Sequence, residues 1–345
     1  MDLSHLGYVH ARTIGGNANM HFKTPTIARR EGDKVYVQRH MPSSIAPPTY
    51  VDAAGFTGPI DRWQEIEFEP VLIRIHTGAC EAGTGAHFYL PQTSLESLSA
   101  ERYSLTGTKT FVTNGGHADS YVVSAVAADP DAPVGQFSCI VVPADASGLK
   151  WGQPWDGLGM RGNSSRSMEL HGVEVPHSNL LGKEGDQIWY IFNVVTPYFL
   201  MAMAGTFLGV ATTALEEARK HLMRRYHAHT GSSLAQTSVL QHRLGTLWGM
   251  LERTRRLTYH AAASFDAGEP DALMAVMAAK VEVADCAVAM VNEAMTLCGG
   301  IGYRSGSRLH RLLRDARAAH LMSPTTDILR VWIGRALMGQ PLLTD

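Results

Sequence analysis

Residues 103–125, YSLTGTKTFVTNGGHADSYVVSA, contain two runs of strand-forming residues with a turn between them. Threonine, valine, tyrosine and phenylalanine are frequent in these runs, and these residue types favour strands. Asn114, Gly115 and Gly116 between the runs tolerate the positive φ angles that a tight turn requires. The stretch therefore predicts a β-hairpin, and taken alone it indicates nothing beyond a surface hairpin.

The same strand-forming composition continues on both sides of this hairpin, from about residue 71 to residue 175. Runs such as VLIRIHTGA, FSCIVVPA and MELHGVEV are separated by segments rich in glycine, proline and aspartate, which favour turns. Several short strands at this spacing are typical of a small barrel or sandwich.

From residue 184 onward, apolar residues recur with the period of a helix. Two such stripes are Leu240, Leu244, Leu247 and Leu251, and Val281, Ala284, Val288, Val291 and Met295. Asp271 is a predicted N-cap, and Gly299 is predicted to end the helix that starts there. Shorter helices are predicted over 307–318 and 325–337. Long antiparallel helices joined by short turns indicate a bundle.

These patterns divide the chain into three parts and predict an α+β fold. Prolines interrupt residues 1–75, where short helices and loops are expected. Residues 76–183 are predicted to form a central β-domain, and residues 184–345 a C-terminal helix bundle.

Composition excludes several classes of function. A net charge of −2 with 18% charged residues is not that of a nucleic-acid-binding protein. The four cysteines form no CxxC pair, which favours a reducing compartment and a cytoplasmic location. The sixteen histidines are scattered without the spacing of metal ligands, so no metal site is expected. The first residues lack the pattern of a secretory signal.

Residues 188–215 contain no charged side chain and are long enough to span a bilayer. However, Asn193, Pro197 and several threonines interrupt the segment, and an amphipathic continuation, EEARKHLMRR, follows directly. We therefore expect no membrane span, but a soluble helix buried on all sides by its own subunit and a neighbour.

Short motifs occur in a characteristic order along the chain. They are residues 81–85 (EAGTG), 107–114 (GTKTFVTN), 158–162 (LGMRG), 175–176 (VP), 181–182 (LG), 299–303 (GGIGY) and 314–317 (RDAR). In order and spacing this series resembles the acyl-CoA dehydrogenase family, from about residue 75 to residue 337. The resemblance implies a helical N-terminal domain, a central β-domain and a four-helix bundle, usually assembled as a tetramer. It also implies FAD between the β-domain and the bundle.

The resemblance also assigns site residues. Thr113 would reach flavin N5 with its hydroxyl, and Arg225 would meet the FAD pyrophosphate of a neighbouring subunit, a role that suits a planar guanidinium. Two extra residues before Gly231 leave Arg224 as an alternative to Arg225. The full set implied for the cofactor is Gly83, Thr84, Phe111, Thr113, Arg225, Thr296, Gly299, Gly300 and Thr325.

Simpler interpretations of these residues remain open. Gly299 and Gly300 are also what a helix end and turn require, and Thr113 is also an ordinary strand threonine. Thr296 stands where the family often has glutamine. The Arg314–Asp315 pair suits a structural ion pair better than a catalytic role.

The family reaction needs a glutamate base, and this sequence places none at either usual position. Ser323 occupies the position beyond the RDAR helix, and the other position falls at about residues 199–200, in a segment without carboxylates. Asp327 is a weak candidate. The N-terminal part is also much shorter than the family's helical domain, since about eighty residues precede Glu81.

Three hypotheses follow. The first is an FAD-dependent dehydrogenase that desaturates an acyl-CoA or acyl-carrier-protein thioester, passes hydride to flavin N5 and delivers electrons to an electron-transfer flavoprotein or a similar acceptor. The second is a catalytically silent subunit of a hetero-oligomer with a related chain, and the homotetramer is the alternative assembly. The third, which the retained RDAR helix disfavours, is a flavin-dependent monooxygenase.

Overall fold

The computed structural model describes residues 26–31, 34–39, 50–51, 57–58, 64–66, 75–78, 81–85, 87–127, 136–185, 192–193, 196–229 and 231–343. Contacts within the chain divide it into two compact units, Met1–Ile73 and Arg74–Asp345.

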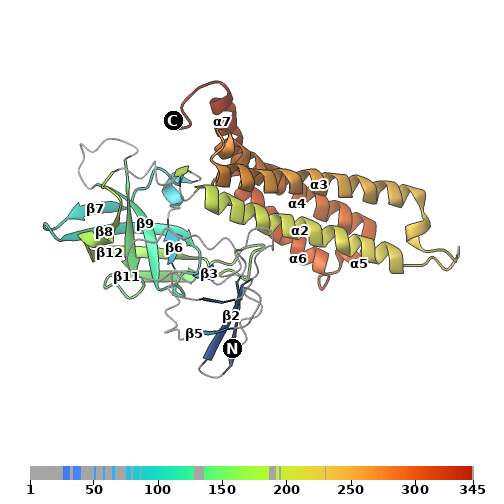
Figure 1. Cartoon of the computed structure of the whole chain (residues 1–345), viewed down its shortest axis with the longest axis horizontal. Coiled ribbons are helices and arrows are strands. Elements are labelled where there is room, and N and C mark those ends of the chain that lie inside the picture. Colours follow the sequence, from blue (N-terminus) through green and yellow to red (C-terminus); the bar gives the residue numbers. More distant parts are fainter. Residues whose placement is uncertain are drawn as a thin grey trace. The chain divides into compact units, whose positions relative to one another are not determined.

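The described part of the first unit consists of strands (Figure 1). β1 (Thr26–Glu31), β2 (Lys34–Arg39) and β5 (Gln64–Ile66) form an antiparallel sheet in that order, and β3 (Tyr50–Val51) pairs with β4 (Thr57–Gly58). The prediction of short helices is therefore wrong for these strands, and the rest of residues 1–75 lies outside the described residues. The Val-Tyr-Val run inside KVYVQR carried the strand signal, because such residues favour a pleated surface.

The second unit begins with an eight-stranded mixed sheet. Its order is β11-β12-β8-β7-β9-β10-β13, and β6 pairs with β9. The strands are β6 (Ile75–Gly78), β7 (Ser94–Ser97), β8 (Arg102–Val112), β9 (Ser120–Ala127), β10 (Ser138–Pro143), β11 (Leu149–Pro154), β12 (Arg166–Pro176) and β13 (Leu180–Leu181).

β8 and β9 do not form the predicted hairpin, because β7 lies between them. Ser94 of β7 pairs antiparallel with Thr106 of β8 and parallel with Val126 of β9. The connection folds back on itself instead: the Tyr121 hydroxyl donates to the Asn114 carbonyl at 2.7 Å. Asn114 (φ 54°) and Gly116 (φ 77°) do adopt positive φ angles, so the turn prediction is confirmed while the strand pairing was wrong.

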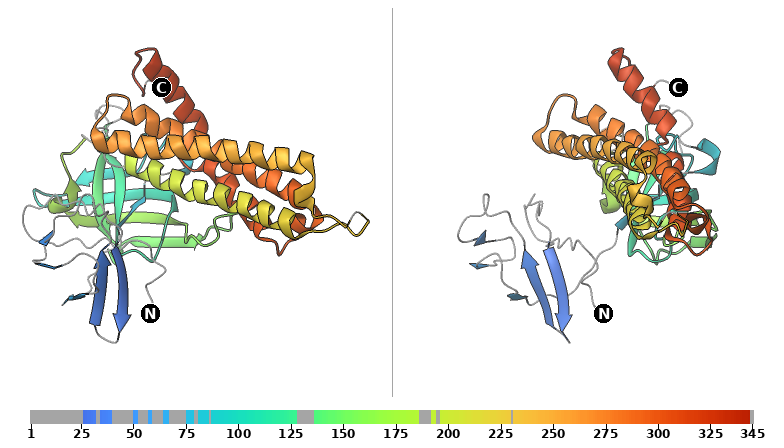
Figure 2. Two further views of the ribbon diagram at one scale, coloured as in Figure 1. Left: turned by 45° about the vertical axis from the view of Figure 1, so that its right-hand side comes forward. Right: turned by 90° about the vertical axis from the view of Figure 1, so that its right-hand side faces the viewer.

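Helices form the rest of this unit (Figure 2). α2 (Thr196–Arg224), α3 (Ser238–Ala267), α4 (Ala272–Cys298) and α6 (Arg308–Leu321) pack as a bundle in which α4 contacts each of the other three. α5 (Gly300–Tyr303) follows α4, and α7 (Thr326–Leu337) also packs on α4. The expected apolar stripe of α3 faces this core, with Leu247 and Leu251 buried and Leu240 and Leu244 packed against it. Most of the α4 stripe faces it too, but Val281 packs against a second apolar core.

The predicted helix ends are confirmed at α4. Asp271 is its N-cap, although the Asp271 side chain makes no capping hydrogen bond, and Gly299 is its C-cap with φ 58°.

α2 is long and apolar enough to cross a membrane by length and composition alone, as is common for the core helix of a soluble protein. Phe207, Ala211 and Ala218 lie on its face toward the bundle core, whereas Tyr198 is 54% exposed. Within this chain the helix is thus buried on one face only, and the contribution of a neighbour stays a prediction.

A shared apolar core joins the sheet to the bundle. Phe137 of the sheet region, Leu200 of α2 and Trp332 of α7 are almost completely buried in it. The Trp332 ring also lies 5.8 Å from that of Tyr89. Because close-packed interiors deform little, this core fixes the end of the sheet relative to the helices.

Candidate functional site

Phe111, near the end of β8, is held in an unusual backbone conformation. Its φ is 59°, which for a bulky side chain costs on the order of 1–3 kcal/mol. The ring is 48% exposed and meets Trp155 edge to face, with centroids 4.9 Å apart. Val112 faces the core and is fully buried, while Thr113, half-buried, lies one residue beyond the strand rather than inside it. Strain of this kind is typical of ligand-binding sites.

Unpaired polar atoms lie beside this strand end. Arg166 of β12 is the register partner of Val112, and its Nε is buried without a hydrogen-bond partner among the described residues. The same holds for Oδ1 of Asn163. Because an unsatisfied buried polar atom costs on the order of 1–3 kcal/mol, these atoms fit a site whose polar ligand supplies the missing bonds.

Gly83 and Thr84 lie in a short 3-10 turn, η1 (Ala82–Thr84), that is anchored by Glu81. The Glu81 carboxylate accepts from the backbone N–H groups of Gln92 (2.8 Å) and Thr93 (3.1 Å) and from Lys109 Nζ. Burial raises the pKa of Glu81, but the Lys109 charge and these hydrogen bonds together lower it by a larger amount. The net pKa of Glu81 therefore lies below its usual value. The turn is thereby tied to β8.

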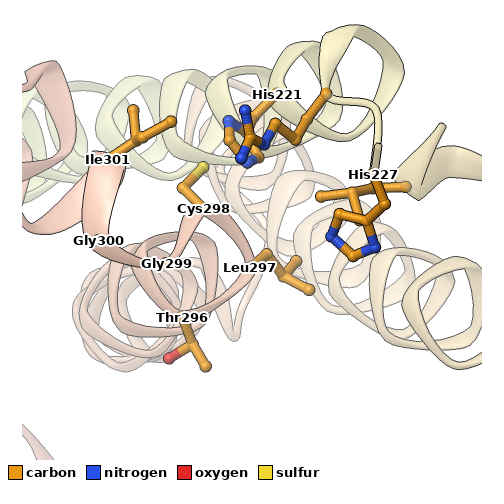
Figure 3. A pocket seen from close by; sticks show the side chains of 10 residues that line it. His221, His227, Thr296, Leu297, Cys298, Gly299, Gly300 and Ile301 are labelled. Atoms are coloured by element: carbon orange, nitrogen blue, oxygen red, sulfur yellow. The ribbon is translucent and has the colours of Figure 1, made fainter. Parts of the chain in front are cut away.

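A pocket of about 390 Å³ lies at the end of the helix bundle (Figure 3). It brings together Arg225, Thr296, Gly299 and Gly300, which are far apart in the sequence. The other lining residues are His221, His227, Leu234, Leu297, Cys298 and Ile301. Gly83, Thr84, Phe111, Thr113 and Thr325 do not line it.

Two glycines leave one wall of this pocket open. A Cβ built on Gly299 or Gly300 meets no atom within 4 Å, whereas one on Gly302 lies 2.8 Å from the Cβ of Cys298. Position 302 thus requires glycine because a side chain would clash, and position 299 favours glycine because its φ is 58°. Gly300 borders free space. The Gly299 N–H already donates to the Thr296 carbonyl at 3.2 Å, so the guanidinium of Arg225 is the group that can donate hydrogen bonds to a phosphate at this open edge.

Arg225, and not Arg224, lines the pocket. The residue follows α2, where its N–H still donates to the His221 carbonyl at 2.9 Å, and its own carbonyl accepts from Leu234 N–H at 2.9 Å. The Thr296 hydroxyl, by contrast, donates to the Asn292 carbonyl of its own helix at 3.0 Å. Sequence reasoning missed His221 and His227; the position of His221 one helical turn before Arg225 was the available signal.

The segment in which the family resemblance implies a base, residues 323–325, contains no acidic side chain. Thr325 is the N-cap of α7, where its Oγ1 accepts from Ile328 N–H at 3.4 Å. On either side of Ser323, the carbonyls of Met322 and Pro324 accept from Lys280 Nζ at 3.2 and 2.8 Å. Burial, together with the Arg330 charge, lowers the pKa of Lys280 to about 8.

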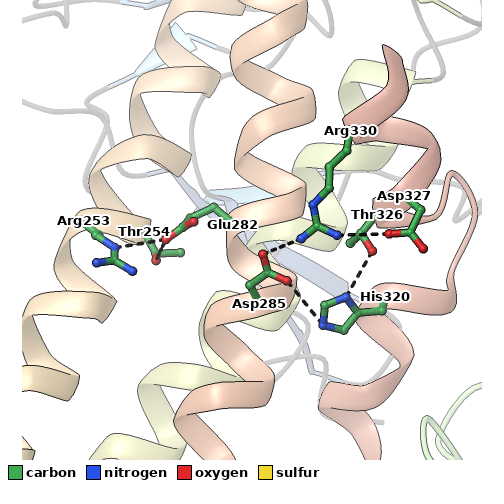
Figure 4. A network of polar contacts seen from close by, with 8 residues as sticks. All are labelled: Arg253, Thr254, Glu282, Asp285, His320, Thr326, Asp327 and Arg330. Atoms are coloured by element: carbon green, nitrogen blue, oxygen red, sulfur yellow. Dashed lines mark hydrogen bonds and ion pairs between the residues drawn. The ribbon is translucent and has the colours of Figure 1, made fainter. Parts of the chain in front are cut away.

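Asp327 is poorly placed to replace the missing base (Figure 4). Its side chain is 90% exposed and pairs with Arg330 at 3.2 Å, and Arg330 also binds Asp285 at 2.7 Å. A carboxylate in water beside an arginine lacks the enclosed, dry pocket in which a catalytic base works. At the alternative position, Phe199 is partly exposed and Leu200 is buried.

Arg314 and Asp315 bind a loop of the β-domain. The Asp315 carboxylate accepts from Met160 N–H at 2.7 Å, and Arg314 Nη1 donates to the Leu158 carbonyl at 2.7 Å. A Cβ on Gly159 would lie 2.2 Å from the Arg314 carbonyl oxygen. This part of the RDAR motif therefore has a structural role, although its partners are backbone groups of the loop.

Three family models match the chain. The acyl-CoA dehydrogenase middle domain matches residues 77–173, and the acyl-CoA dehydrogenase C-terminal domain matches residues 199–338. A model of the vanillate O-demethylase oxygenase C-terminal domain matches residues 1–108 and so overlaps the first of these. The start of the chain therefore matches a different family from the helical N-terminal domain that the resemblance implies.

Individual proteins give the same result. An acyl-CoA dehydrogenase of Bacillus subtilis is 33% identical over 238 residues, which are 69% of this chain and 62% of that protein. The structure of butyryl-CoA dehydrogenase from Megasphaera elsdenii is similar with a TM-score of 0.71 at 26% identity, covering 76% of this chain and 68% of that one. The prolyl acyl carrier protein oxidase AnaB is similar with a TM-score of 0.69 at 25% identity, covering 76% and 68%. The chain spans less than two thirds of the first curated relatives.

Proposed function

Since residues 77–338 belong to the acyl-CoA dehydrogenase family, whose members are FAD-dependent flavoproteins, we propose that this chain binds FAD and dehydrogenates an acyl thioester. The observation that carries the proposal is the pocket at the bundle end, where Arg225, Gly299 and Gly300 converge. The thioester is carried by CoA or by an acyl carrier protein. The electrons leave to an electron-transfer flavoprotein or a similar acceptor, and the protein is cytoplasmic.

Each group of residues has a task in this proposal. Arg225 donates to the pyrophosphate oxygens of FAD held by a neighbouring subunit, and the open edge at Gly299 and Gly300 lets that ligand approach the backbone. At the end of β8, outside this pocket, the exposed ring of Phe111 offers an apolar face and the Thr113 hydroxyl offers a hydrogen bond. When bound, FAD would supply the hydride acceptor.

The empty base position supports a second candidate function. Neither Ser323 nor residues 199–200 can accept a proton as a carboxylate, and Asp327 is exposed and paired. A silent subunit, which completes the flavin site of a related chain in a hetero-oligomer, needs no base of its own. The described residues before Arg74 are strands, so we infer that the acyl pocket is open or completed by another chain.

Anaerobic flavin reduction distinguishes these functions. The full chain is purified, its flavin is quantified by absorbance, and butyryl-CoA is added without oxygen. Bleaching by the chain alone establishes the dehydrogenase. Bound flavin that bleaches only after a glutamate-bearing relative is co-expressed establishes the silent subunit. A chain that binds no flavin, alone or co-expressed, overturns both.

Matched arginine variants test the placement of the phosphate site. Arg225→Gln is expected to lower FAD affinity at least tenfold, because a charge-assisted hydrogen bond contributes about 1.5–3 kcal/mol. Arg224→Gln, which removes the same charge from outside the pocket, is the control and leaves affinity near that of the unmodified chain. Equal losses in the two variants would contradict the placement.

A further inference from the structure

We propose that His221 is a second phosphate-binding residue of the bundle-end pocket and that diphosphate binding there is coupled to protonation of its imidazole. The inference rests on the proposed dinucleotide site and adds to it a residue and a pH dependence. The ligand class is the diphosphate of a dinucleotide.

His221 and Arg225 enter the pocket from one helical turn. Residues four apart on a helix lie side by side, and the hydrogen bond from Arg225 N–H to the His221 carbonyl (2.9 Å) shows that this spacing persists at the end of α2. Figure 3 shows the His221 ring near Cys298, with Gly299 and Gly300 along the adjoining wall. A ligand against the open glycine edge is therefore within reach of both nitrogen-bearing side chains.

The groups around His221 set its charge. Arg225 follows His221 by one helical turn, and His227 and Cys298 line the same pocket. Burial raises the pKa of Cys298 to about 11, so that it stays a neutral thiol. Glu217, one turn earlier on α2, is engaged by Arg308 of α6 at 3.2 Å. The described surroundings thus present positive or neutral groups to the ring, and the nearby carboxylate is already paired.

This environment makes the imidazole responsive to an anion. Burial and the Arg225 charge lower the pKa of His221 below its usual value, so the ring is neutral at neutral pH before a ligand binds. A diphosphate placed between His221 and Arg225 reverses the sign of the local field and stabilises the imidazolium. Binding therefore takes up a proton, and affinity rises as the pH falls.

Calorimetry on the full chain, freed of flavin by high-salt dialysis, tests the coupling. The probe is ADP-ribose, because its diphosphate is esterified at both ends and does not titrate near neutral pH. Titrations at about pH 6 and about pH 8, in buffers of different ionisation enthalpy, report affinity and proton uptake. The expected result is net proton uptake near neutral pH and an affinity several-fold higher at the lower pH.

Three variants decide the assignment. His221→Gln is expected to bind ADP-ribose about tenfold more weakly at about pH 6 and with little change at about pH 8. Its binding is also expected to take up no proton. His221→Lys, which keeps a charge at both pH values, is expected to bind tightly at both. His229→Gln, outside the pocket lining, is the control and behaves as the unmodified chain.

The outcomes separate this inference from the proposed function. If His221→Gln keeps the affinity and proton uptake of the unmodified chain while FAD still binds, the inference is wrong and the flavin function stands. If the unmodified chain binds neither ADP-ribose nor FAD, both are wrong.

Discussion

At the scale of single residues, Lys109 is the charge that orders the turn beside β8. It is fully buried, and its Nζ donates to the Glu81 carboxylate and to the Ser124 hydroxyl at 3.2 Å. Glu81 is 5% exposed. A buried pair contributes little net stability compared with an apolar pair, but a buried charge left without its partner is costly.

We predict that Lys109→Met destabilises the chain by about 3–5 kcal/mol, because Glu81 keeps its burial and loses its counter-charge. Urea unfolding measures the change. The double variant Glu81→Gln, Lys109→Met is expected to recover most of the loss. A double variant that is no more stable than the single one would contradict this account.

The same pair gives a pH dependence with a defined sign. The pKa of Glu81 is lowered by folding, so its contribution is complete above the usual carboxyl pKa and is lost as the pH falls through the lowered value. Glu81→Gln is expected to flatten the stability curve on the acid side.

Thr113 tests the cofactor wall that we propose at the end of β8. Thr113→Val keeps shape and removes the hydroxyl, so it is expected to weaken FAD retention or shift the flavin spectrum. Thr108→Val, at an exposed position of the same strand, is the control. Unchanged flavin content and spectrum in Thr113→Val would count against this placement.

At the scale of elements, α6 holds the loop between β11 and β12. Asp315 and Arg314 bind the backbone at Met160 and Leu158, and Gly159 lies against the Arg314 carbonyl. The loop therefore depends on a helix that is remote in the sequence.

Asp315→Ala is predicted to destabilise the chain by about 1.5–3 kcal/mol, the range for a hydrogen bond to a charged group, and to raise hydrogen exchange at residues 157–163. Asp327→Ala removes an exposed acid from its pair with Arg330 and is the control, with a change below about 1 kcal/mol. Gly159→Ala is expected to raise exchange in the same loop, since its Cβ would meet backbone. Faster exchange elsewhere but not in this loop would contradict the role given to α6.

At the scale of the whole molecule, the division at Ile73 predicts where the chain tolerates truncation. A chain that starts at Arg74 keeps β6 on β9 and is expected to unfold at the same urea concentration as the corresponding transition of the full chain. A chain that starts at residue 80 loses the parallel pairing of Ile75–Gly78 with Ser120–Val123 and is expected to unfold earlier.

Circular dichroism during unfolding compares the two truncated chains. Equal midpoints would show that β6 contributes nothing to the second unit. An early transition in both would show that the first unit stabilises the second, contrary to the division of contacts.

Much of the fold was predictable because its determinants are local. The apolar stripe of α3, the start of α4 at Asp271 and its end at Gly299 follow from helical periodicity and capping. The positive φ angles of Asn114 and Gly116 follow from turn chemistry. The strands before Arg74 were missed because their signal is short and surrounded by prolines.

The candidate site was predictable only in part. The order of motifs singled out Arg225, Gly299 and Gly300, but the choice of Arg225 over Arg224 as a pocket residue depends on how α2 ends. Only its place in the pocket makes His221 a candidate, because a histidine on a helix carries no signal by itself.

The sequence by itself determined the element types of the second unit, the motif order that identifies the family and the lack of a glutamate at the base positions. Tertiary structure alone decided that β7 separates β8 from β9, that Lys109 neutralises Glu81 in the core, and that one pocket is lined by residues 296–301 together with His221, Arg225, His227 and Leu234. The physical reason is range: propensity and capping act within a few residues, whereas strand order, charge pairing and pocket walls depend on segments that meet only when the whole chain packs.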